Sequence, residues 1–228
     1  GTLSLANNTV LAATGNFAVR NDYLLGGTLN FRSPSALNLN GAGGLTLGGA
    51  LNISVDAPAG KLTLGGMLYQ TAGTAGLRKT GPGTLVLGNN NLFTGGIALS
   101  AGTLLLGGTA GSVVAPLPSF SEAPGSVVTV YSGLLQLLND GVASNSNIAF
   151  TGTKVVADAS APALNLQIGP NGGGFIQNTI ELGTLEMSAG QTLNLLSGGS
   201  YSLKIDALFT GTQSSTTPVS INVPTGMS

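Results

Sequence analysis

Leucine and small polar residues alternate in short segments along most of the chain. The recurring pattern is a glycine followed by an apolar residue at every second position, as in residues 102–106 (GTLLL). Alternation with a period of two places the apolar side chains on one face of a half-buried β-strand. No longer segment shows the 3.6-residue period of a helix, so we predict an all-β protein. Clear copies lie at residues 1–5, 27–31, 43–47, 60–64, 83–87 and 102–106, and weaker ones at 133–137, 163–166, 183–187 and 191–195.

The spacing of these copies favours a solenoid over other all-β folds. The first leucines of five successive copies are Leu29, Leu45, Leu62, Leu85 and Leu104. The steps between them scatter around a period of roughly 20 residues, which is typical of solenoid coils. A propeller blade needs about 40 residues, and a sandwich needs no fixed motif at this spacing. We therefore predict a single-stranded parallel β-helix with coils of about 20 residues. About 11 coils stacked at about 4.8 Å would form a rod on the order of 50 Å long.

Glycine pairs mark the expected corners of the coils. Glycine adopts the positive φ angles of sharp turns without a steric penalty. Four pairs follow or separate predicted strands: Gly48-Gly49, Gly65-Gly66, Gly95-Gly96 and Gly107-Gly108.

A proline-containing segment interrupts the repeats. Three prolines fall within residues 115–124, where no alternation is visible. Proline cannot donate a hydrogen bond to a β-ladder. We expect residues 114–126 to form a loop or joint between regular coils at 1–113 and more divergent coils, ending in a Ser/Thr-rich tail, at 127–228. The loop is either a plain insertion or an arm that docks on a partner.

Composition and charge narrow the function classes. The chain has 228 residues, 37 of them glycine, and only 7% are charged, for a net charge of −1. Its few basic residues are scattered, so the clustered basic footprint of a nucleic-acid-binding protein is missing. The apolar runs are far shorter than the roughly 20 residues of a membrane-spanning helix. Low charge weakens the repulsion between copies and makes self-association easier.

Few residues could support catalysis. The chain contains no histidine and no cysteine, which removes Ser-His-Asp and Cys-His catalysis, thiolate and imidazole metal sites, and disulfides. An enzyme that cleaves polysaccharides would need two carboxylates about 5–10 Å apart. Glu181 and Glu186 are the closest pair in the sequence, but their odd offset predicts opposite faces of one strand. We expect no catalytic, cofactor or metal site; a polysaccharide-acting enzyme remains the least favoured alternative.

One segment carries a more specific signature. Leu77 to Leu104 contains LRKTGPGTLVL (77–87), an asparagine-rich turn (88–91), FTGG (93–96) and AGTL (101–104). This segment resembles the passenger-associated repeat of bacterial autotransporters. The resemblance implies a right-handed parallel β-helix on the outside of a Gram-negative-type cell, in which the repeat is a structural coil without catalytic residues. No export signal is visible, so we expect the targeting segments to lie outside this sequence.

Two functions from different classes follow. The first is an extracellular structural protein: a solenoid that self-assembles through its open strand edges, with other copies of itself as partners, or forms part of a cell-surface fibre or coat. The alternative is an adhesin stalk or passenger domain that presents a binding loop to a host surface, a neighbouring cell or a glycan. Both place the chain outside the cell or on the bacterial surface.

Overall fold

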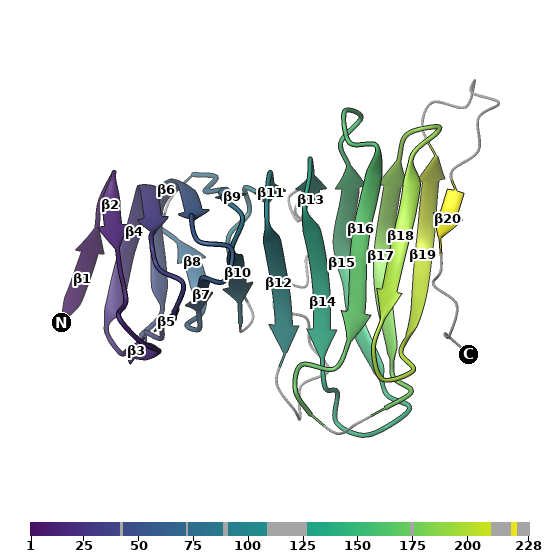
Figure 1. Cartoon of the computed structure of the whole chain (residues 1–228), viewed down its shortest axis with the longest axis horizontal. Coiled ribbons are helices and arrows are strands. Elements are labelled where there is room, and N and C mark those ends of the chain that lie inside the picture. The colour runs from purple at the N-terminus through teal and green to yellow at the C-terminus, as the bar shows by residue number, and fades with distance from the viewer. Residues whose placement is uncertain are drawn as a thin grey trace.

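The chain forms a rod of stacked parallel strands in a computed structural model that describes residues 1–41, 43–71, 73–88, 91–108, 127–173, 176–210 and 220–222 (Figure 1). Within these residues the regular elements are all strands, arranged in an 11-stranded and a 9-stranded sheet. The pairing between named strands is parallel throughout. Because the chain alternates between the two sheets, it winds as the predicted parallel β-helix. The right-handed winding stays a prediction.

Each sheet gains about one strand per coil. The main path of the first sheet runs β1 (Thr2–Leu5), β4 (Asp22–Phe31), β6 (Leu45–Val55), β9 (Leu77–Thr80), β11 (Ile97–Leu99), β13 (Val127–Val130), β15 (Asn147–Ala157), β17 (Thr179–Met187) and β19 (Ser202–Thr210), while β2 (Thr9–Leu11) pairs with β4 and β8 (Leu68–Gln70) pairs with β6. The second sheet runs β3 (Phe17–Val19), β5 (Ala36–Leu39), β7 (Lys61–Leu64), β10 (Thr84–Leu87), β12 (Thr103–Gly108), β14 (Leu134–Asn139), β16 (Ala163–Gly169), β18 (Thr192–Ser197) and β20 (Ser220–Asn222).

The long strands of the first sheet turn a corner within their length. The first half of β6 pairs with β8 and its second half with β9. Between β4 and β6 the register shifts, so that Leu25 pairs with Leu47 but Gly27 pairs with Leu51. Gly48-Gly49 lies at this shift, inside β6 rather than between two strands. The corner is therefore a bulge in a continuous strand.

Stacked leucines fill the interior, as the alternation predicts. In the second sheet, Leu62 pairs with Leu85, Leu85 with Leu104, Leu104 with Leu135, and Leu135 with Leu166. All five side chains are fully buried. Full burial of one such side chain stabilises the fold by about 1.5–3 kcal/mol. This ladder is the main cohesive element between coils.

The predicted coil length is correct for only part of the rod. From Leu62 through Leu85 to Leu104, the ladder steps are close to the expected coil of about 20 residues. The later steps are half as long again: Gln136 and its ladder partner Gln167 are separated by 31 residues. With nine strands along each main path, the estimate of about 11 coils is too high.

The estimated number of coils is too high because the motif copies do not occupy equivalent positions in successive coils. Leu29 pairs with Ile53, and Leu45 pairs with Tyr23, so these two leucines lie in different rows of the first sheet. Leu62, counted next, belongs to the second sheet. One coil can contain apolar alternation in both sheets. The number of residues between successive motif copies is therefore smaller than the number of residues in a coil.

Three of the four glycine pairs lie at corners. Gly65-Gly66 and Gly95-Gly96 fall outside strands as predicted, and Gly48-Gly49 lies at the bulge inside β6. The prediction was wrong for Gly107-Gly108, which ends β12 and pairs with Leu138 and Asn139. Residues 114–126 lie outside the described residues, so the predicted loop and the domain boundaries stay predictions.

Candidate functional site

A buried lysine joins two coils in the segment that carries the repeat signature. Lys79 is fully buried in β9, in an interior row between Ile53 and Leu99. Its Nζ donates to the backbone carbonyls of Thr80 at 2.6 Å, Gly81 at 2.8 Å and Ala101 at 3.1 Å. These carbonyls belong to the corners after β9 and β11. The lysine of the motif therefore fastens one corner to the corner of the next coil.

Burial changes the acidity of this lysine. Loss of water around the ammonium lowers the pKa of Lys79 to about 8, although the negative charge of Asp56 opposes the shift. Hydrogen bonds from a charged donor are roughly twice as strong as those between neutral groups. Three of them offset part of the desolvation, which explains how a cation is held inside a leucine-rich core.

The glycines of the motif are required by the contact between corners. Gly81 has a φ of 74°. A Cβ atom at Gly83 would lie 2.4 Å from the Ala57 carbonyl oxygen, and one at Gly102 would lie 2.4 Å from the Gly81 carbonyl oxygen. Any side chain at these positions would push the stacked corners apart. This segment of the repeat therefore combines three close-packed glycines in two corners with one lysine clamp.

Asn91, the buried asparagine of the motif, also helps to hold neighbouring coils together. Asn91 is fully buried; its Oδ1 accepts from the Leu68 amide at 2.9 Å, and its Nδ2 donates to the Gly88 carbonyl at 3.2 Å. Asn178 repeats the arrangement outside the motif, with the Ser146 amide at 2.8 Å and the Asp140 carbonyl at 3.0 Å. Sequence reasoning missed Asn178 because no repeat signature surrounds it.

A buried polar network surrounds Asn178. Its Nδ2 also donates to Tyr201 Oη at 3.0 Å, and that hydroxyl donates to the Asn139 carbonyl at 2.9 Å, 62 residues earlier. Asp140 Oδ1 accepts from the amides of Asn171 and Gly173, each at 2.7 Å. Burial raises the pKa of Tyr201. The network connects successive coils, although Asn139 Nδ2 is buried without a hydrogen-bond partner.

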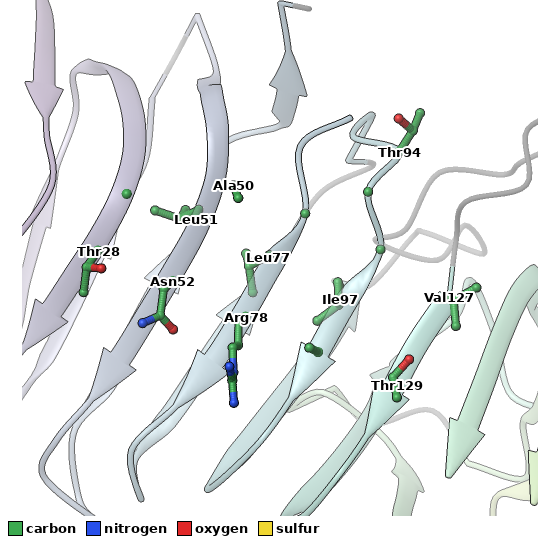
Figure 2. Close-up of a pocket in the computed structure, with 15 residues that line it drawn as sticks. Thr28, Ala50, Leu51, Asn52, Leu77, Arg78, Thr94, Ile97, Val127 and Thr129 are labelled. Atoms are coloured by element: carbon green, nitrogen blue, oxygen red, sulfur yellow. The ribbon is translucent and has the colours of Figure 1, made fainter. Parts of the chain in front are cut away.

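A shallow hollow of about 680 Å³ lies on the outer face of the first sheet (Figure 2). It crosses β4, β6, β9, β11 and β13. One outward row runs through it in register: Thr28, Asn52, Arg78, Ala98 and Thr129. Gly76, Gly95 and Gly96 line its corner side.

Arg78 is the charged residue of this hollow. Its side chain is exposed, and its Nε donates to Ser100 Oγ at 3.1 Å. The lining contains no carboxylate, and within the described residues Arg78 forms no ion pair. The repeat signature thus places two neighbouring cations on opposite faces of β9: Lys79 inside and Arg78 outside.

The prediction that Glu181 and Glu186 lie on opposite faces of one strand is wrong. Both Glu181 and Glu186 point outward, because two successive outward-facing residues, Gly183 and Thr184, shift the alternation of β17 by one position. Glu181 pairs with Lys204 at 3.1 Å, which raises the pKa of that lysine, and Glu186 pairs with Lys154 at 2.5 Å. Each carboxylate is thus occupied by a lysine of an adjacent strand.

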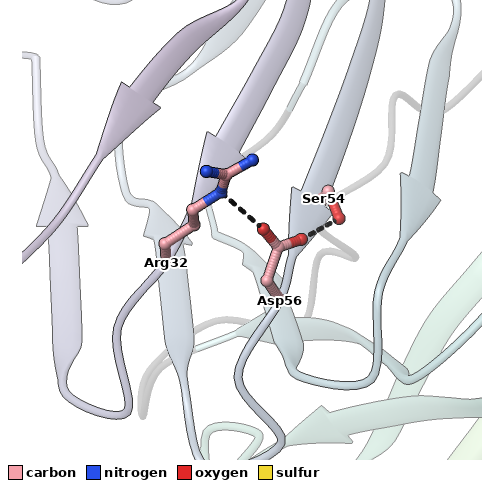
Figure 3. Close-up of polar contacts among 3 residues, drawn as sticks. All are labelled: Arg32, Ser54 and Asp56. Atoms are coloured by element: carbon pink, nitrogen blue, oxygen red, sulfur yellow. Dashed lines mark hydrogen bonds and ion pairs between the residues drawn. The ribbon is translucent and has the colours of Figure 1, made fainter.

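Asp56 in the first coils follows the same pattern, whereas Asp22 Oδ1 accepts from the Gly43 amide at 2.7 Å. Arg32 Nε donates to Asp56 Oδ2 at 3.1 Å, and Ser54 Oγ donates to the other carboxylate oxygen (Figure 3). In the part of the chain that the structure describes, no group of three or more acidic, histidine or cysteine side chains could hold a metal ion. The same residues include no helix of the length and hydropathy needed to span a bilayer.

Comparisons with known proteins agree with the motif. Residues 77–106 match the family model of the passenger-associated-transport-repeat, so this segment is the repeat that the sequence signature indicated. The chain is also 37% identical over 107 residues to a protein named "Adhesin BmaC autotransporter" from Brucella suis biovar 1 (strain 1330). The match covers 46% of this chain but 3% of that protein. No solved structure matches the chain significantly.

Proposed function

We propose that this chain is part of the surface-exposed passenger of an autotransporter-type adhesin, in which a β-solenoid rod carries a binding surface away from the bacterial cell. The observation that carries the proposal is the passenger-associated repeat at 77–106, built into a continuous ladder of coils on both sides. The similarity to an adhesin autotransporter supports the same function.

The surface chemistry fits an extracellular rod. Only 7% of the residues are charged, and Asp56, Glu181 and Glu186 are each held by a cation. We propose that the chain binds and does not catalyse. Incubation of the chain with polysaccharides should release no new reducing ends; release that disappears in Glu181→Gln would contradict this part of the proposal.

Location and adhesion can be tested separately. Antibodies raised against the folded chain should label intact cells of the source bacterium, and external protease should remove the label. Beads coated with the chain should adhere to host cells or to a bacterial lawn, and soluble chain should compete. Labelling only after the cells are permeabilised would overturn the surface location, and beads that adhere no better than albumin-coated beads would overturn the adhesin function.

A second candidate function is self-assembly into a fibre or coat. At the first coil, Leu3, Phe17 and Val19 occupy interior-row positions, since they pair with Tyr23, Leu37 and Leu39. They are nevertheless 45%, 54% and 36% exposed. When the 228-residue chain stands by itself, this edge has no partner strand, and an open strand edge with apolar row ends favours pairing with another parallel strand. We propose that a strand of a second copy pairs with the isolated chain at this edge.

Sedimentation and electron microscopy test this candidate. Oligomers or filaments should grow with concentration in the wild-type chain and decrease in Phe17→Lys, which places a charge at the open edge. Tyr131→Lys, at another exposed aromatic position (44% exposed), is the matched control. A chain that stays monomeric at high concentration would remove this candidate and leave the adhesin proposal in place.

A further inference from the structure

We propose that the hollow across β4, β6, β9, β11 and β13 binds an acidic oligosaccharide, with the Arg78 guanidinium holding its carboxylate. The inference rests on the adhesin function proposed above and adds a site and a ligand class to it. It differs from the sequence hypothesis, which placed binding on the proline-containing loop.

The hollow has a structural cause. β4 and β6 extend on both sides of the corner, whereas β9 and β11 begin at Leu77 and Ile97, directly after Gly76 and Gly96. Gly76, Gly95 and Gly96 therefore contribute no side chains along the corner beside the short strands, and the long strands run alongside (Figure 2). A volume of about 680 Å³ lies within the range of roughly 300–1,000 Å³ that is typical of small-molecule sites. The hollow therefore suits a short oligomer.

The lining repeats a hydrogen-bonding group along the rod axis. Thr28 and Thr129 contribute hydroxyls and Asn52 contributes an amide, whose Oδ1 is buried and unpaired, each at the same rung position in its own coil. Adjacent strands are about 4.8 Å apart, a step comparable with the length of one sugar residue. A linear glycan lying along the axis would meet polar groups at four of the five rungs, Thr28, Asn52, Arg78 and Thr129, with Ala98 as the exception.

The positive charge of Arg78 favours a ligand that carries a carboxylate. Arg32, Lys154 and Lys204 have carboxylate partners on the protein, whereas the hollow around Arg78 offers none. The bond to Ser100 uses Nε and leaves the terminal nitrogens to form the paired hydrogen bonds that guanidinium makes with carboxylates. A uronic or sialic acid supplies such a carboxylate together with hydroxyls.

A peptide fits this face less well. Peptides commonly bind sheets by adding a strand at an open edge, but β6, β9 and β11 are each paired on both sides. The leucines beneath the hollow do not offer an apolar pocket, because Leu51 and Leu77 are 2% exposed. Recognition therefore depends on hydroxyl, amide and guanidinium groups, as for a glycan.

Calorimetric titration tests the site with three probes: tetragalacturonate, a hyaluronan tetrasaccharide and a sialylated trisaccharide. We expect the 228-residue chain to bind at least one of them, and Arg78→Gln to weaken that binding at least tenfold. Arg20→Gln removes the same charge at another exposed position and should leave the affinity unchanged. Ala98→Phe fills the hollow beside Arg78 and should abolish binding although the guanidinium is retained.

Several results would overturn the inference. Binding of none of the three probes would do so, as would equal affinity for the methyl-esterified, uncharged sugar. An equal loss in Arg20→Gln would indicate nonspecific charge attraction, and tighter binding of tetraglutamate would indicate a peptide site. If the wild-type chain adheres to cells and Arg78→Gln adheres equally well, this inference fails and the adhesin proposal stands. If the wild-type chain binds the sugar but does not adhere, the adhesin proposal fails instead.

Discussion

The two halves of the rod close their corners in different ways. Around the repeat at 77–106, coils are short, glycines let the backbones approach directly, and the Lys79 ammonium fastens the carbonyls. From β14 onward the coils are longer, and buried polar side chains fill the larger corners. Gln191 resembles Lys79 in function there: its Nε2 donates to the carbonyls of Asp158 at 2.6 Å and Ala161 at 2.7 Å. Both halves therefore hold corners with buried polar side chains, as Asn91 does in the repeat, and the short coils add glycines whose backbones contact one another directly.

We expect the largest loss of stability from a substitution of Asn178, the buried polar residue at a corner of the long coils. Asn178→Leu leaves the Ser146 amide and the Asp140 carbonyl without their present partner, while the Tyr201 hydroxyl loses one donor and keeps its bond to the Asn139 carbonyl. We expect the free energy of unfolding to fall by about 3–5 kcal/mol, because each buried unpaired group is destabilising by about 1–3 kcal/mol. Urea denaturation followed by circular dichroism measures the change. Asn147→Ala, at an exposed position in β15, should change stability by less than about 0.5 kcal/mol.

The clamp of the short coils comes next. Lys79→Met keeps the length of the side chain but removes three hydrogen bonds to carbonyls, partly offset by relief of the buried charge. We expect a loss of about 2–4 kcal/mol. The same urea experiment on Arg78→Gln, one residue away on the outer face, should show a change below about 0.5 kcal/mol. Equal effects of the two substitutions would contradict the clamp.

The corner glycines differ in how closely neighbouring backbone atoms approach them. At Gly95 a Cβ atom would lie 2.4 Å from the Ala75 carbonyl carbon, whereas at Gly49 nothing lies within 4 Å. Gly95→Ala should therefore destabilise the chain by about 1–3 kcal/mol through overpacking. Gly49→Ala should be neutral or stabilise by up to about 1 kcal/mol, because alanine restricts the unfolded chain. Thermal melts of both variants test the pair, and a stabilising Gly95→Ala would show that the corners are not in contact.

Lys79 can ionise and Gln191 cannot, so we expect Lys79 but not Gln191 to make the stability of the fold depend on pH. The pKa of Lys79 is about 8 in the folded chain and about 10.4 when unfolded. Between these values the unfolded state binds more protons, so stability rises with pH. Above about pH 10 the raised pKa values of Tyr23 and Tyr201 reverse the trend. Urea midpoints at pH 7.5 to 9.5 should increase in the wild type and stay flat in Lys79→Met; a wild-type profile as flat as that of the variant would refute the buried ammonium.

Surface ion pairs should contribute least. Lys154 and Glu186 are 43% and 42% exposed, and exposed pairs typically contribute about 0–1 kcal/mol. Glu186→Gln should lower stability within that range, and 1 M salt should remove the difference from wild type. A loss as large as that of Asn178→Leu would mean that surface charge, not corner filling, holds the long coils together.

The sequence by itself determined the strands and their buried faces. Each clear motif copy lies in or at the start of a strand, and the leucines at alternate positions are in the core, except Leu3 in the first coil. This information is local: a period of two specifies a half-buried strand without reference to its partner. The repeat signature likewise identified the coil at 77–106, and its lysine, glycines and asparagine each proved to serve stacking.

Only the tertiary structure decided which strands pair and what their corners contain. A strand and its partner are separated by a whole coil, which is short between Leu85 and Leu104 and longer between Leu135 and Leu166. The corners within each coil carry no periodic signal that would fix this length. A bulge at Gly183 and Thr184 was enough to turn Glu186 to the same side as Glu181. The Tyr201–Asn139 bond and the hollow beside Arg78 depend on three or more coils being stacked in register. Such features arise from the accumulated length of the corners, which no single segment encodes.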